Sequence, residues 1–97
     1  MTPIQKTALV TVGMGGLGEA IARALHDAGL RVLVTHARDE GSAKEWLAAE
    51  RDKGYSFTSY DVNVADFKSC QRMAERINAE GHQIDILVNN AGITRDA

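Results

Sequence analysis

A chain of 97 residues allows one small domain, and its 44% apolar and 25% charged residues are an ordinary balance for a globular fold. The net charge of -2 gives no electrostatic basis for binding nucleic acid or an anionic membrane, and no apolar run approaches the roughly 20 residues of a transmembrane helix. The single cysteine cannot form an internal disulfide and the first residues lack a signal-peptide layout, so we expect a cytoplasmic protein.

Short apolar runs alternate with segments of helical periodicity along the whole chain. The run Thr7–Val12 is rich in β-forming residues and stops at glycines, which predicts a buried strand. Gly29 is a typical helix stop and Arg31–Thr35 predicts a second buried strand. Between these strands a stripe at helical spacing predicts a helix, with inner residues Leu17, Ile21, Leu25 and Ala28.

The alternation continues in the second half of the chain. Residues Ser42–Lys53 predict a helix with Trp46 and Leu47 on its inner face and a charged, solvated outer face, and Tyr55–Val62 predicts a less apolar third strand. Asp66 is the expected N-cap of a third helix, and Ile84–Val88 is the expected fourth strand. The third helix ends at Gly81, and its predicted inner stripe is Phe67, Cys70, Ala74 and Ile77.

This order of strands and helices predicts an α/β fold with a doubly wound parallel sheet and helices on both faces, in one domain over residues 1–97. The expected strand order is 3-2-1-4. The fourth strand would then be an apolar edge. We therefore expect either that the chain is the N-terminal part of a longer protein or that something else covers this edge.

Glycines lie where the first strand meets the first helix. Gly13, Gly15, Gly16 and Gly18 would let the backbone approach a pyrophosphate, and the helix N-terminus offers N–H groups and the positive end of its dipole. A glycine turn without a ligand is the alternative. The strand-turn-helix context favours a nucleotide site.

The turn Thr11-Val-Gly-Met-Gly-Gly-Leu-Gly18 resembles the T-G-x-x-x-G-x-G pattern of the short-chain dehydrogenase/reductase family. Asn89-Asn-Ala-Gly92 is that family's N-N-A-G motif, and Asn63-Val-Ala-Asp66 is similar to its N-V-x-D element. The resemblance covers almost the whole chain. The run from Ile84 to Asp96 is similar to bacterial β-ketoacyl carrier-protein reductases and acetoacetyl-CoA reductases, and Glu45-Trp-Leu47 favours the latter.

The resemblance implies a Rossmann-type half-domain and assigns roles to its residues. Asn63 and Val64 would flank the adenine, and Asp96 would lie on the substrate side. The glycine turn and the N-N-A-G segment would bind the cofactor, through Gly13, Met14, Gly15, Gly16, Leu17, Gly18, Asn89, Ala91, Gly92 and Ile93. Val12 replaces the first glycine of the family's turn, and a β-branched residue resists positive φ.

The end of the second strand bears on the choice of cofactor. NAD-binding relatives carry an acidic residue there, whereas this chain reads Thr35-His-Ala-Arg38 with no acid before Asp39. Arg38 suits a 2′-phosphate, which favours NADP, although a solvated loop arginine is the alternative. His36 could also contact the ribose, but an exposed loop histidine is the favoured interpretation.

The family's catalytic Tyr-x-x-x-Lys pair is absent from this sequence, because Ser59 and Val64 stand four residues after Tyr55 and Tyr60. We therefore expect no catalytic residue and an inactive chain. It would supply NADPH binding to a reductase of acyl-CoA or acyl carrier-protein 3-oxoacyl thioesters, tetrameric at full length. A non-catalytic nucleotide-binding or partner-complementing fragment is the alternative.

The remaining candidates for chemistry have simpler interpretations. His26 and His82 are expected at the surface with no metal site, and Cys70 is expected to be a buried structural thiol.

Overall fold

The computed structural model describes residues 5–12, 14, 16–37, 40–63 and 65–89. Strands and helices alternate as the sequence predicts. The elements are β1 (Thr7–Val10), α1 (Gly16–Asp27), β2 (Arg31–His36), α2 (Glu40–Asp52), β3 (Phe57–Asp61), α3 (Phe67–Ala79) and β4 (Ile86–Val88). Within the described part of the chain, every helix is too short or too polar to cross a bilayer.

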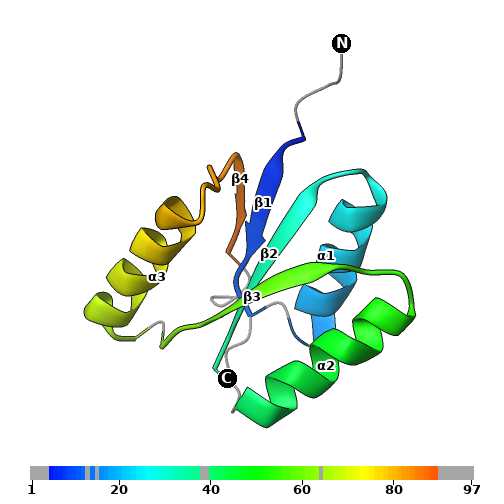
Figure 1. Ribbon diagram of the computed structural model, residues 1–97, viewed down its shortest axis with the longest axis horizontal. Coiled ribbons are helices and arrows are strands. Elements are labelled where there is room, and N and C mark those ends of the chain that lie inside the picture. Colours follow the sequence, from blue (N-terminus) through cyan, green and yellow to red (C-terminus); the bar gives the residue numbers. More distant parts are fainter. Residues whose placement is uncertain (1–4, 13, 15, 38–39, 64, 90–97) are drawn as a thin grey trace.

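The four strands form one parallel sheet in the order β3-β2-β1-β4, which confirms the predicted topology. Val10 of β1 lies in register with Val34 of β2 on one side and with Val88 of β4 on the other. Helices α1 and α2 cover one face of the sheet and α3 covers the other (Figure 1). Because the strands are parallel, their carboxyl ends meet at one edge.

The face under α1 and α2 holds the larger part of the core. Val10, Val32 and Val34 of the sheet pack against Ala22 of α1 and against α2. From α2 the contacts come from Ala43 and Trp46, and the Trp46 indole stacks on Phe57 with ring centroids 5.4 Å apart. The packing role predicted for Trp46 is therefore confirmed.

The face under α3 holds a smaller cluster of Leu9, Leu33, Tyr60 and Ile77. Asp66 caps α3 as predicted, because its side chain accepts a hydrogen bond from the Lys68 N–H. The predicted inner stripe is only partly right. Ile77 is buried, whereas Cys70 is half-buried, Ala74 is exposed, and Phe67, the first residue of α3, is 79% exposed.

Three further expectations were wrong. β1 ends at Val10 and not at Val12, since Val12 has a φ of +54°, which no strand residue adopts. The stripe predicted for α1 is wrong at both ends, because Leu17 is 55% exposed and Ala28 lies beyond the end of the helix and is exposed. The outer face of α2 is not fully solvated, because Glu50 is 1% exposed.

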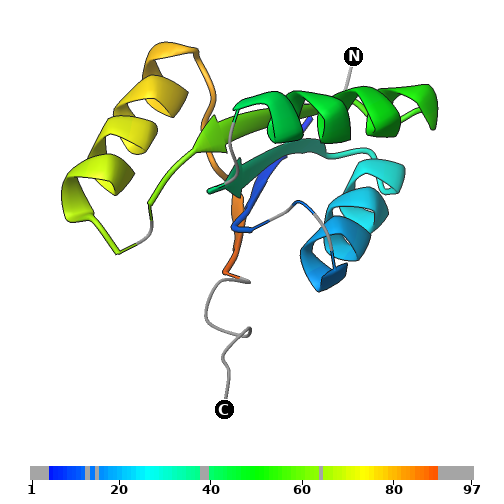
Figure 2. The same ribbon diagram turned by 90° about the horizontal axis from the view of Figure 1, so that it is seen from below.

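Glu50 is buried through a contact with α1. Its two carboxylate oxygens accept hydrogen bonds of 2.7 Å each from the Arg23 guanidinium, which also lies 3.3 Å from Glu19. Glu19 in turn accepts a 2.7 Å hydrogen bond from the Trp46 indole. This polar network joins the two helices above the α1–α2 core, and Figure 2 shows these helices together on one side of the sheet with α3 on the other.

Candidate nucleotide-binding site

The turn after β1 lies at the edge where the strands' carboxyl ends meet. α1 begins at Gly16, whose φ of +58° favours glycine although a Cβ there would meet nothing within 4 Å. In the first turn of α1, Gly18 is buried and Leu17 is 55% exposed. The N-terminus of α1 therefore faces this edge, and such an end provides backbone N–H donors and a positive dipole for an anion.

Hydrogen bonds tie the turn to the strands on both sides of β1. The Thr11 N–H donates to the Val88 carbonyl at 3.0 Å, and the Thr11 hydroxyl lies 3.3 Å from Asn89 Oδ1. On the other side, the Val12 N–H donates to the Thr35 hydroxyl oxygen at 2.9 Å. The hydrogen-bonding role of these two threonines could not be predicted from the sequence, because only the strand order shows which residues flank the turn.

Met14 belongs to the predicted cofactor-binding set. Its side chain is 6% exposed and packs in the α1–α2 core with Val10 and Trp46. The Met14 side chain is therefore committed to packing, so any contact that this residue makes with a ligand comes from its backbone.

The structure separates the two predicted asparagines. Asn89 directly follows β4 and lies beside Thr11, so it belongs to the glycine turn's surroundings. Asn63 follows β3, beyond β2, and its Oδ1 accepts a 3.1 Å hydrogen bond from the Ala65 N–H. The Asn63 N–H also donates to the Ser69 hydroxyl at 2.9 Å, so this residue organises the entry to α3.

His36 is the last residue of β2 and only 6% exposed, so the expectation of an exposed loop histidine was wrong. Its carbonyl accepts a 2.9 Å hydrogen bond from the Val62 N–H, which extends the pairing of β2 with β3 and fixes the residue in the sheet. Within the described part of the chain, its buried Nδ1 has no hydrogen-bond partner. A buried polar atom without a partner is rare in folded proteins.

Several predicted residues cannot be placed. They lie outside the described residues, and their roles remain predictions: Gly13, Gly15, Arg38, Val64, Ala91, Gly92, Ile93 and Asp96.

Both tyrosines have pKa values shifted upward. Burial raises the pKa of Tyr60 to about 12, together with the Glu80 carboxylate that accepts a hydrogen bond from its hydroxyl. Partial burial and the nearby Asp27 also raise the pKa of Tyr55 above its usual range. A tyrosine that donates a proton near neutral pH needs the opposite shift, so neither hydroxyl suits that role.

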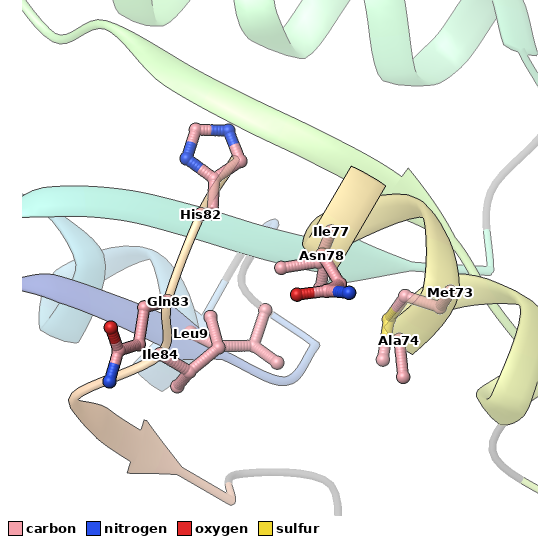
Figure 3. Close-up of a pocket in the computed structure, with 8 residues that line it drawn as sticks. All are labelled: Leu9, Met73, Ala74, Ile77, Asn78, His82, Gln83 and Ile84. Carbon is pink, nitrogen blue, oxygen red and sulfur yellow. The ribbon is translucent and has the colours of Figure 1, made fainter. Parts of the chain in front are cut away.

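A separate cavity of about 380 Å³ lies beside α3 (Figure 3). Its lining is mainly apolar and comes from Leu9, from α3 residues such as Ile77, and from the segment around Ile84 that leads into β4. It contains none of the predicted site residues. The described residues also hold no group of three or more side chains that could bind a metal ion.

Comparisons with known proteins place these features in context. A sequence profile described as "short chain dehydrogenase" matches residues 6–97. Nodulation protein G of Azospirillum brasilense is 46% identical over 92 residues, which are 95% of this chain and 37% of that protein. Acetoacetyl-CoA reductase of Cupriavidus necator is 38% identical over 92 residues, with the same two shares.

Among solved structures, the 2-keto-3-deoxy-D-gluconate dehydrogenase from Streptococcus agalactiae superposes with a TM-score of 0.82 at 32% identity. The match covers 93% of this chain and 34% of that chain. The chain thus spans little more than a third of the length of these relatives, and it does so with their α/β fold.

Proposed function

The chain belongs to the short-chain dehydrogenase family, and from that premise we propose that it forms the NADP-binding part of a 3-oxoacyl-thioester reductase. The complete protein would reduce an acetoacetyl-CoA type substrate to the 3-hydroxyacyl thioester. The likeness to acetoacetyl-CoA reductase supports this substrate class. The thioester would be that of coenzyme A or of an acyl carrier protein.

One observation carries the nucleotide-binding part of the proposal. The turn between β1 and α1 has two residues in the left-handed region, at Val12 and Gly16, and hydrogen bonds attach it to both neighbouring strands. A turn held in this way brings backbone N–H groups and a helix N-terminus to the carboxyl edge of a parallel sheet. Dinucleotide pyrophosphates bind at such an edge in doubly wound folds.

The end of β2 fits the adenosine ribose of the cofactor. His36 offers a buried Nδ1 without a partner in the described residues, and an imidazole nitrogen can donate or accept a hydrogen bond. It occupies the end of the strand where NAD-binding proteins carry an acid for the ribose hydroxyls. The lack of that acid, with Arg38 two positions later, supports NADP over NAD.

The chemistry is divided between this chain and the remainder of the complete protein. Bound NADPH would supply the hydride, and this chain's residues would hold and orient its adenosine and pyrophosphate. The sequence contains no tyrosine followed by a lysine four residues later, and both tyrosine pKa values are raised. We therefore propose that the chain alone does not turn over and that activity belongs to a longer, tetrameric, cytoplasmic enzyme.

Calorimetric titration of the 97-residue chain with NADPH and NADH tests the proposal. We expect saturable binding, with NADPH tighter by about tenfold, since a guanidinium–phosphate contact contributes on the order of 1.4 kcal/mol. Arg38→Ala should remove the preference and leave NADH binding unchanged. Arg51→Ala, an exposed arginine in the last turn of α2, is the matched control. Equal affinity for both nucleotides, or none for either by a folded chain, contradicts the proposal.

A second candidate function rests on β4. Leu87 is 61% exposed and Ile86 is 37% exposed on this short edge strand. A non-catalytic fragment that pairs with a partner through β4 is consistent with such an edge. A folded chain that binds neither nucleotide and forms a stable dimer through β4 would favour this candidate.

A further inference from the structure

Val12 is the sole non-glycine residue with a positive φ in the described part of the chain. Its φ of +54° lies in the left-handed region, where the Cβ of an L-residue crowds the following carbonyl. For a β-branched residue this conformation is a true outlier. The surrounding structure must hold it, because an isolated valine would leave this region.

The nearest such restraint is on the neighbouring strand. The Thr35 side chain is 1% exposed, and its hydroxyl oxygen accepts the Val12 N–H at 2.9 Å. Thr35 is itself fixed by the sheet, since it lies in register with Tyr60 of β3 and next to the buried His36. A rigid strand therefore holds the amide of the strained residue.

We infer that Thr35 is a positioning residue whose hydroxyl holds Val12 in the left-handed conformation and so presets the turn for the nucleotide. That this conformation prepares the turn for a nucleotide rests on the proposed function. That Thr35 holds Val12 in the conformation does not. Thr35 acts through Val12 and need not touch the ligand. A glycine at position 12 would adopt the same conformation without restraint, so the need for Thr35 is specific to valine.

A double-mutant cycle tests this coupling. Thr35→Val keeps the shape of the side chain and removes the acceptor, Thr35→Ser keeps the hydroxyl, and Val12→Gly removes the strain. Each variant is titrated with NADPH, and the backbone chemical shifts and couplings of residue 12, which distinguish positive from negative φ, are measured by NMR without nucleotide.

We expect Thr35→Val to abolish the positive φ of residue 12 and to weaken NADPH binding about tenfold, since the competent turn is then rarely populated. In the Val12→Gly background the same change should cost less than about threefold, because glycine needs no restraint. Thr35→Ser should bind like the original chain. If Thr35→Val destabilises the chain too far for titration, urea midpoints of the variants that still fold report the coupling, and adding Val12→Gly to Thr35→Val should restore a cooperative unfolding transition.

Equal effects of Thr35→Val in both backgrounds would overturn the inference. So would a residue 12 that keeps its positive φ in Thr35→Val, or a Thr35→Ser variant as impaired as Thr35→Val. If Thr35→Val shifts the φ of residue 12 but the original chain binds no NADPH, the positioning role stands and the proposed function fails.

Discussion

The two faces of the sheet differ in how completely they are covered. Under α1 and α2, valines of β1 and β2 are fully buried and a network from Glu19 to Glu50 joins the helices above them. On the other side, α3 covers a smaller cluster, a cavity lies beside it, and β4 exposes Leu87. The difference indicates that the α1–α2 face supplies most of the stability of this chain.

The candidate site lies between these two regions. Val12 is hydrogen-bonded to β2, which belongs to the well-covered part, whereas Thr11 is hydrogen-bonded to β4 at the open edge. The nucleotide site therefore depends on both regions. Destabilising either should affect it, but only the α1–α2 face should control whether the chain folds.

The largest contrast is expected between two aromatic residues. Trp46→Ala should lower the free energy of unfolding by about 4 kcal/mol, because it removes a buried indole that stacks on Phe57. Phe67→Ala, which removes a 79% exposed ring from α3, should cost less than about 0.5 kcal/mol. Urea unfolding followed by circular dichroism measures both. Similar losses would contradict the comparison.

Two arginines offer a second contrast. Arg23→Ala leaves the buried Glu50 carboxylate with Lys53, 3.6 Å away, as its one ion-pair partner among the described residues, and should lower the Tm by roughly 10 °C. Arg76→Ala breaks the more exposed 3.4 Å pair with Glu80 on α3 and should lower the Tm by less than about 3 °C. Calorimetric scans of both variants measure these changes in Tm. A larger decrease in Tm for Arg76→Ala would contradict the conclusion that the α1–α2 face supplies most of the stability.

The acid dependence of stability should also come from the α1–α2 face. The hydrogen bonds from Arg23 lower the pKa of Glu50 below its ordinary value of 4.5. The stabilisation is then fully present above that value and is lost as the pH falls through the lower, folded-state pKa. We expect Glu50→Gln to be less stable than the original chain by about 1 kcal/mol at neutral pH, with the gap closing as the solution is acidified below pH 4.5.

Urea titrations at neutral pH and at several pH values below 4.5 measure this gap. Glu45→Gln, which changes an exposed carboxylate of the same helix, is the control and should alter stability little at any of these pH values. A gap for Glu50→Gln that stays constant with pH would show that the carboxylate is not stabilised by its arginine.

The smallest effect on folding is expected at the open edge. Leu87→Lys places a charge on a 61% exposed position of β4 and should change the free energy of unfolding by less than about 0.5 kcal/mol. Any self-association of the chain through β4 should, however, decrease in sedimentation experiments, because a charge opposes pairing at this edge. Unchanged self-association would mean that β4 is not the contact between copies.

The order of strands and helices and the capping of α3 could be predicted because they follow from local signals, and the topology rules for doubly wound sheets then predict the strand order. Alternating apolar runs, the glycines and Asp66 each act within a few residues of the structure they specify. The position of the glycine turn directly after β1 could be predicted for the same reason, since its glycines lie within that turn.

The contacts that complete the site could not be predicted, because they join distant residues. Thr35 and Val12 are 23 positions apart, and Arg23 and Glu50 are 27 apart. The burial of His36 likewise depends on how far the pairing of β2 with β3 extends. A helical stripe also overestimated the burial of Phe67, since periodicity does not tell where the covered part of a helix begins.

Mapping NADPH binding by NMR would test the central claim most directly. On titration of the 97-residue chain, we predict shifts in the amide signals of Thr11, Val12, the first turn of α1, His36 and Asn89, at the carboxyl edge of the sheet. Signals around the α3 cavity, such as those of Ile77 and Ile84, should stay in place. Shifts confined to that cavity, or no shifts in a folded chain, would contradict the assignment of this edge as a nucleotide-binding site.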